Sequence, residues 1–473
     1  MSKFQRDLTE GSVMKQLLRF SLPFLLSNLL QALYNLADML IVGNYCGPVG
    51  TSAVGIGGQV TILLINLISG LAVGGTVMIA QFIGSKKQEE VARTIGTMFS
   101  LYAIAGVVMT VVMLLSNHAI LVLMGTPQES FADAYAYLTI CMSGTIFIFG
   151  YNAVAAVLRG MGDSRHPLIF VAIAAVVNVV LDFVMVGGMG MGPAGAAWAT
   201  IIAQAVSFLL SVVFLRRSDF IFDFKLKSFR IHKRLAVQLL KIGLPSSLQG
   251  TLVCFSFMAL TRMGNDIGGL VGSNALSIAG KVNSIGILPS MAMQASVSSM
   301  VGQNMGAGKP ERAKKTMFCA IGIAFAVSAL LFAGVNLFPQ QIVGLFLGSP
   351  EGSALDPVIF RRCIVEGAEY LQYISMDYIV ASVVFCINGL AIGVGQTTFS
   401  LLNSFVSSLL LRVPLAWLLG VQLGYGLPGI GVAAPLAEVG SLIVGIIYLS
   451  TGRWKKHRLA VLGGGNPPPR EAN

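Results

Sequence analysis

The sequence predicts an all-α polytopic membrane protein with twelve transmembrane helices, in two six-helix lobes related by a pseudo-two-fold axis along the membrane normal. Three observations indicate this fold. Of the 473 residues, 55% are hydrophobic and only 11% are charged, whereas soluble domains carry about 25% charged residues. Mean hydropathy is +0.79. Apolar runs long enough to cross a bilayer recur along the chain, and the second half repeats the first.

The expected spans follow from hydropathy alone. The first six runs lie at 14–43, 52–83, 93–115, 131–158, 167–187 and 194–215. The second six lie at 238–263, 272–304, 314–338, 366–391, 398–420 and 429–450.

Basic residues support this count and predict the orientation. Lysine and arginine gather before the first run, in every second loop and after the last run, and the opposite loops hold almost none. The positive-inside rule therefore predicts a multi-pass protein of the cell (plasma) membrane with both termini cytoplasmic. The net charge of +11 then reflects topology and some attraction to anionic membrane lipids, which argues against a nucleic-acid partner.

An internal repeat divides the chain. The segment Gln16–Pro23 aligns with Gln238–Pro245, and the alignment runs at one constant offset, without gaps, to Gln81–Gly84 over Gln303–Gly306. Because each repeat holds six spans, both halves enter the membrane in the same direction. We expect four parts: an N-terminal lobe (N-lobe), an interfacial cytoplasmic linker, a C-terminal lobe (C-lobe) and a disordered cytoplasmic tail. They cover 1–215, 216–237, 238–450 and 451–473.

Acidic residues within the spans point to the chemistry. The N-lobe has Asp38 in span 1 and Asp182 in span 5, with no lysine or arginine at membrane depth. An acid there costs about 2.5–3.5 kcal/mol on insertion scales, so such groups are usually functional. Two carboxylates without basic partners need a proton or a bound cation.

Polar neighbours complete this predicted site. Asn178 precedes Asp182 by four residues and Asn35 precedes Asp38 by three, so each acid has an amide on its own helix face. Thr200 falls at a similar depth in span 6. Carboxylate, amide and hydroxyl oxygens suit Na⁺ as well as a proton. Plainer roles stay open: structural acids, amide contacts between helices, and a threonine bonded to its own backbone.

The C-lobe differs, because it can balance its charges. Asp377 and Glu438 lie in spans 10 and 12, and Lys281 and Arg412 lie in spans 8 and 11. The two bases are either structural counter-charges or ligands in a substrate cavity. Tyr373 precedes Asp377 by four residues, so the pair could line a cavity for cationic solutes, although packing also explains the tyrosine.

With these residues in view, the chain resembles the multidrug and toxic compound extrusion (MATE) antiporters. The resemblance covers all but the two tails. It is carried by the twelve spans in two repeats and by four motifs: SLP at 21–23 followed by Asp38, LRGMGD at 158–163, NVVLD at 178–182 and GPAGAAWAT at 192–200. It implies a V of two lobes that exports organic cations in exchange for Na⁺ or H⁺.

The resemblance also implies roles for individual residues. Asp38, Asn178, Asp182 and Thr200 resemble the family's N-lobe cation site, and Asp377 with Tyr373 resembles an acidic C-lobe position of one branch. That branch has a glutamate about eight residues after the span 7 proline, where this chain has Val253. The departure favours the DinF-like rather than the NorM-like branch, with coupling through the N-lobe.

The sequence thus predicts a secondary active multidrug efflux antiporter, a monomer that exports organic cations in exchange for H⁺ or Na⁺ and uses no other cofactor. A lipid-linked saccharide flippase of the same superfamily is the alternative, but it would need a strongly cationic cavity. No nucleophile–base set or histidine cluster is evident, which argues against an enzyme.

Overall fold

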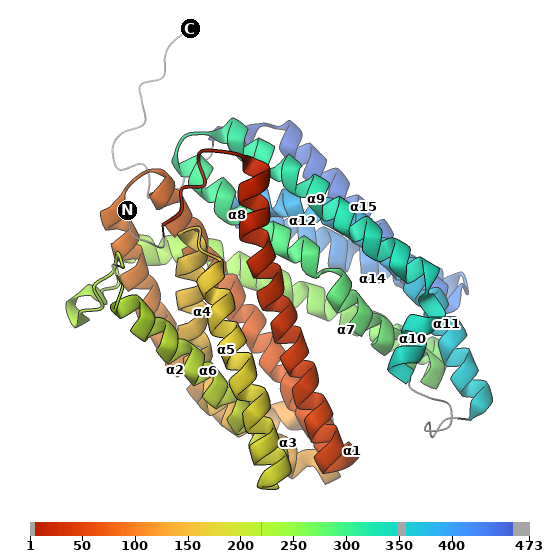
Figure 1. Cartoon of the computed structure of the whole chain (residues 1–473). Helices are drawn as coiled ribbons and strands as arrows, with labels where there is room; N and C mark the ends of the chain where they lie inside the picture. Colours follow the sequence, from red (N-terminus) through yellow and green to blue (C-terminus); the bar gives the residue numbers. More distant parts are fainter. Residues whose placement is uncertain (1–4, 219, 348–355, 457–473) are drawn as a thin grey trace.

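The fold was obtained as a computed structural model, which describes residues 5–218, 220–347 and 356–456. Within these ranges the chain is helical and contains no strand (Figure 1). The helices of the first half are α1 (Val13–Gly84), α2 (Gln88–Leu123), α3 (Gln128–Ser143), α4 (Thr145–Gly160), α5 (Arg165–Asp182) and α6 (Gly192–Arg216), with a π-helix, η1 (Phe183–Gly188). The expected tail falls mostly on 457–473, outside the described residues.

The second half contains more breaks. After the short 3₁₀ turn η2 (Leu226–Ser228), its helices are α7 (Lys233–Gly286), α8 (Leu288–Gly306), α9 (Pro310–Leu337), α10 (Pro339–Leu347), α11 (Pro357–Ser375), α12 (Asp377–Val394), α13 (Thr397–Phe405), α14 (Val413–Ala416) and α15 (Gly426–Ser450). Two π-helices, η4 (Val406–Arg412) and η5 (Trp417–Gln422), interrupt span 11, and η6 (Arg453–Lys456) ends the described chain.

The long helices α1 and α7 each contain a break at a glycine. Gly47 in α1 has φ 65° and ψ −160°, and Gly269 in α7 has φ 53° and ψ −130°. Such positive φ values favour glycine, which has no Cβ. The two glycines occupy equivalent positions of the sequence repeat, so the turn between the first two spans of each lobe recurs in three dimensions.

The predicted fold class is confirmed. By length and composition, ten helices in the described ranges could cross a membrane, or eleven when the bent pair α3 and α4 counts as one span. One of the ten, Lys233–Gly306, has 74 residues and breaks at Gly269. At 1.5 Å per residue it is far longer than one crossing, so it supplies two of the twelve expected spans.

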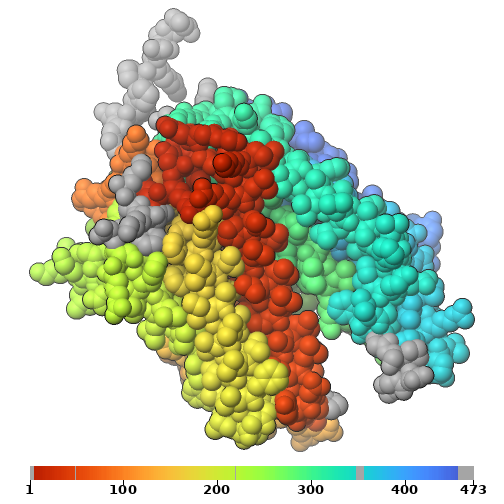
Figure 2. Space-filling view, viewed as in Figure 1, coloured from red at the N-terminus to blue at the C-terminus, as the bar shows by residue number. Residues whose placement is uncertain are grey.

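The two bundles meet at one end and separate at the other (Figure 1). Residues 5–12 lie at the joined end, which we call the closed end, together with the loops that follow Gly84, Gly160 and Gly306. At the opposite, open end, the molecular surface is notched between the first and second halves (Figure 2).

At the closed end, the first helix of each half packs with the other half. Leu8, Val13 and Leu17 belong to a buried apolar cluster built mainly from α8, α9 and α12. In return, Leu239 and Ile242 of α7 belong to the large apolar cluster of α1–α6. This exchange ties the halves together where they meet.

Candidate functional site

The N-lobe acids come together in the interior. Asp38 of α1 is 6% exposed, and Asn178 and Asp182 of α5 are 1% and 0% exposed. Thr200 of α6 donates its hydroxyl to Oδ2 of Asp38 at 3.4 Å. The side chains of Asp182 and Asn178 also lie within reach of Asp38. Three helices therefore place two carboxyls, an amide and a hydroxyl at one point.

This cluster has unmet bonding capacity. Oδ1 of Asp38, both carboxylate oxygens of Asp182 and both polar atoms of Asn178 are buried without a hydrogen-bond partner among the described residues. Within the same ranges neither acid forms an ion pair with a lysine, arginine or histidine. Buried polar groups are nearly always paired. The chemistry of these atoms suits a proton shared by the carboxyls, and it equally suits Na⁺ bound by the oxygens of Asp38, Asn178, Asp182 and Thr200.

The local backbone explains how Asp182 is presented. Regular α-helix ends at Asp182, and the π-helix η1 begins at Phe183. Single π turns within helices occur often at functional sites, because the wider turn redirects a side chain and loosens the hydrogen-bond ladder. Asp182 is therefore the last residue of the regular helix and is followed directly by the π turn.

One predicted member does not join the cluster. The side chain of Asn35 is exposed, whereas Asp38, three residues later, is buried. Residues three apart on a helix differ in direction by about 60°. That offset is enough to place Asn35 at the edge of the buried face. The expectation that Asn35 and Asp38 share one helix face does not hold in the structure.

Other residues around the acids were not anticipated from the sequence. Tyr34 and Gln204 contact each other, and Tyr34 lies near Asp38. Tyr137 and Cys141 of α3 also interact with each other close to Asp38. Tyr34 is four residues before Asp38, and Gln204 is four after Thr200, so helical spacing from the predicted site could have found both.

The C-lobe acids lie in a different environment. Arg412 at the end of η4 donates to Oε1 of Glu438 in α15 at 3.1 Å, and Ser407 donates to the same oxygen at 3.0 Å. Asp377 at the start of α12 lies within electrostatic range of both charges. The guanidinium of Arg412 also covers the ring of Phe257, 5.0 Å from its centroid.

Two of the four residues predicted for the substrate cavity therefore meet. Asp377 and Arg412 are 2% and 3% exposed and share this charged cluster. Tyr373 is half-buried in α11, and Lys281 is exposed on α7. The expected balance of two acids against two bases is thus wrong in detail. Of the two bases, Arg412 is buried in the C-lobe, whereas the side chain of Lys281 is exposed.

The chain is similar in sequence to known membrane transport proteins. The model of a protein family described as MatE matches residues 23–184 and 245–418. A probable multidrug resistance protein of Bacillus subtilis, YpnP, is 30% identical over 453 residues, which is 96% of this chain and 98% of that protein. The probable multidrug resistance protein NorM of Thermotoga maritima is 25% identical over 461 residues, 94% of each chain.

The chain is also similar in three dimensions to a solved structure. The structure described as the outward-facing conformation of a multidrug resistance MATE family transporter of the MOP superfamily superposes with a TM-score of 0.88 at 26% identity. It covers 95% of this chain and 98% of that one. The similarity spans both halves of the chain.

Proposed function

This chain belongs to the MatE family, whose members are membrane transporters and not enzymes, and we propose that it is a multidrug efflux antiporter. It exports organic, mostly cationic compounds in exchange for H⁺ or Na⁺ by alternating access of its two lobes. The closed end faces the cytoplasm and the notch faces outward, as the positive-inside pattern predicts. The similarity to an outward-facing transporter supports this orientation.

One observation carries the proposal: two buried carboxyls lie together in the N-lobe without a base paired to either among the described residues. When the proton or Na⁺ leaves, two like charges face each other in a medium of low dielectric, and the repulsion favours another packing of α1 and α5. Asp38 is on α1, whose first turns pack in the C-lobe cluster. A shift of α1 therefore acts on the contact between the lobes, which links ion binding to access.

The C-lobe cluster is a poorer coupling site. Arg412 already holds Glu438, and it lies near Asp377. We assign coupling to the N-lobe, and we place the organic cation between the lobes with the half-buried Tyr373 on the C-lobe side. Arg412 acts as a structural counter-charge, and Lys281 has no part in either site.

The test is transport by purified protein in proteoliposomes, with H⁺ and Na⁺ gradients imposed separately. We expect either gradient, or both, to drive export of a fluorescent organic cation. In Asp38→Asn, gradient-driven export should fall at least about tenfold, because an amide cannot exchange a proton or neutralise Na⁺. Asp266→Asn, which changes an exposed acid, should export like the native protein.

The same vesicles test the rival function. Scrambling of a labelled lipid without gradient-driven export would indicate a flippase. Full export by Asp38→Asn would remove this carboxyl from the mechanism.

A further inference from the structure

The closed end is held by two glutamines that the repeat makes equivalent. Gln81 and Gln303 occupy the same position of the two repeats, and both are buried, at 1% and 0% exposed. Nε2 of Gln81 donates to the carbonyl of Gly393 in the C-lobe at 2.8 Å. Nε2 of Gln303 donates to the carbonyl of Gly160 in the N-lobe at 3.3 Å. Each lobe thus reaches the other through the same kind of bond.

The two acceptors are equivalent as well. Gly160 and Gly393 each lie at the C-terminal end of a helix, α4 and α12. The last carbonyls of a helix have no partner within it. Two residues on, Gly162 and Gly395 turn the chain with φ of 86° and 94°. Each glutamine therefore pairs with a buried carbonyl at a helix end of the opposite lobe.

Close backbone contact accompanies these bonds. A Cβ atom on Gly84 would collide with the carbonyl oxygen of Gln303, and one on Gly306 would collide with that of Gln81. Gly84 and Gly306 are again equivalent positions of the repeat. The two lobes touch here along their backbones, so the glutamine amides are sealed from water while the closed end stays closed.

One irregular segment of the chain makes the two glutamine contacts unequal. Residues 5–12, which we call the strap, cross the closed end before α1 begins. The amide of Leu8 donates to Oε1 of Gln303 at 3.0 Å, whereas Oε1 of Gln81 is buried without a partner among the described residues. The strap also touches the N-lobe, because the amide of Arg6 donates to the carbonyl of Met161 at 3.0 Å.

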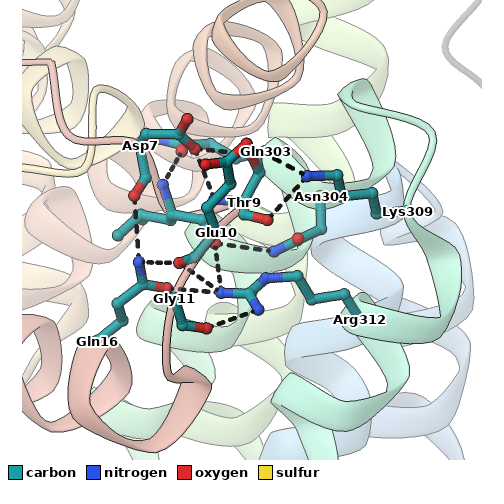
Figure 3. A network of polar contacts seen from close by, with 10 residues as sticks. Asp7, Thr9, Glu10, Gly11, Gln16, Gln303, Asn304, Lys309 and Arg312 are labelled. Atoms are coloured by element: carbon teal, nitrogen blue, oxygen red, sulfur yellow. Dashed lines mark hydrogen bonds and ion pairs between the residues drawn. The ribbon is translucent and has the colours of Figure 1, made fainter.

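Two bases of the C-lobe fasten the strap (Figure 3). Arg312 of α9 donates to the carbonyls of Gly11 at 2.9 Å and Glu10 at 2.8 Å, and to Oε1 of Gln16 at 2.9 Å. Lys309 donates to the carbonyl of Thr9 at 3.0 Å. Leu8 is buried beneath these contacts in the C-lobe cluster.

We infer that Gln81 and Gln303 form a two-armed clasp that holds the closed end shut, and that the strap locks only the Gln303 arm. This inference deepens the proposed function, since it names the contacts that must break before the transporter opens on this side. Opening breaks both glutamine bonds, and beside the Gln303 arm it must also break the bond by which Arg6 of the strap holds Met161 of the N-lobe. The two arms are therefore unequal, and Gln303 holds more strongly than Gln81.

The experiment measures how often the closed end opens. Glu89 and Glu311 are exposed and lie at equivalent positions on opposite lobes. Each is replaced by cysteine in a cysteine-free background, and the two cysteines are then spin-labelled. Pulsed electron paramagnetic resonance on the full chain in lipid nanodiscs then gives the distribution of distances across the closed end. No drug and no ion gradient are needed, so the result does not depend on whether the protein exports organic cations.

We expect Gln303→Ala to raise the long-distance population at least about fivefold over the native protein, with a smaller rise for Gln81→Ala. Arg312→Ala should also raise it, because the strap loses its main fastening. Lys315→Ala, an exposed base three residues further along α9, is the matched control and should change nothing. If Gln303→Ala does not purify, Gln303→Glu tests the same bond by replacing the donor with an acceptor. An unchanged distribution in the glutamine variants overturns the clasp, and a larger effect for Gln81 than for Gln303 overturns the role of the strap.

Discussion

Each lobe has a pair of acids in its interior, but the two pairs have opposite surroundings. In the N-lobe, Asp38 and Asp182 lie together with an amide and a hydroxyl, and no described base pairs with them. In the C-lobe, Arg412 is held between aromatic and acidic groups and pairs with Glu438. The C-lobe cluster contains a base of its own, whereas the N-lobe cluster has none among the described residues. The repeat therefore duplicated the scaffold but not the charge balance, and this difference is the reason for proposing that the driving ion binds in the N-lobe.

Removing the internal base should have the largest effect on stability. Arg412→Ala leaves Glu438 and Asp377 buried without compensation, so we expect a loss of about 3–5 kcal/mol. Thermal unfolding in detergent measures this loss. Lys281→Ala is the control, because its exposed side chain makes no contribution to the cluster. Equal melting temperatures for the Arg412 and Lys281 variants would contradict the assigned role of the ion pair.

Neutralising one acid should have opposite consequences in the two lobes. Asp38→Asn removes one of two neighbouring like charges at almost constant volume, so stability near neutral pH should be unchanged or rise by up to about 1 kcal/mol. Glu438→Gln instead leaves Arg412 without its carboxylate and should cost about 3 kcal/mol. The same unfolding assay compares them. A large loss in the Asp38 variant would mean that this acid is a structural partner.

A smaller, pH-dependent difference is expected at the closed end. Asp163 follows Gly162, and at the matching place after Gly395 the C-lobe has Gln396. Burial raises the pKa of Asp163, but the hydrogen bond and charge of His166 and the amides of Arg165 and His166 outweigh it, so the pKa lies below the ordinary value of 3.8. The carboxylate therefore stabilises the fold above that ordinary value, and this contribution is lost as the pH falls through the lower folded value.

Asp163→Asn should accordingly cost about 1 kcal/mol near neutral pH and almost nothing once the pH is below the folded pKa. Denaturation at a series of pH values checks this. Gln396→Asn should show no such pH dependence, because Gln396 accepts a bond from the Tyr448 hydroxyl and carries no charge. A constant difference for the Asp163 variant across the range would contradict this account of the pair with His166.

Much of this arrangement could be predicted from the sequence, for physical reasons. A bilayer imposes long apolar spans, and the internal repeat places Gly47 over Gly269 and Gln81 over Gln303. The N-lobe spans hold Asp38 and Asp182 but no lysine or arginine, which predicts a shared site with Asn178 and Thr200, and in the structure these four side chains lie together.

The errors and omissions have a physical cause too. Asn35 and Lys281 were assigned by depth and helix face, but the direction of a side chain at the edge of a face depends on how neighbouring helices are rotated. Tyr137 and Cys141 approach Asp38 from another helix, and Gln81 reaches a carbonyl of the other lobe. Contacts between helices distant in sequence depend on tertiary packing, which no local pattern encodes.

In the proposed mechanism, the driving ion acts on the N-lobe acids and not on the C-lobe acids. The most direct test compares gradient-driven export by Asp182→Asn and Asp377→Asn in the same proteoliposomes, with Na⁺ and pH gradients varied separately. We predict that Asp182→Asn loses its response to both gradients, whereas Asp377→Asn still responds to whichever gradient drives the native protein. A gradient response that survives in Asp182→Asn, or that disappears only in Asp377→Asn, would contradict the account.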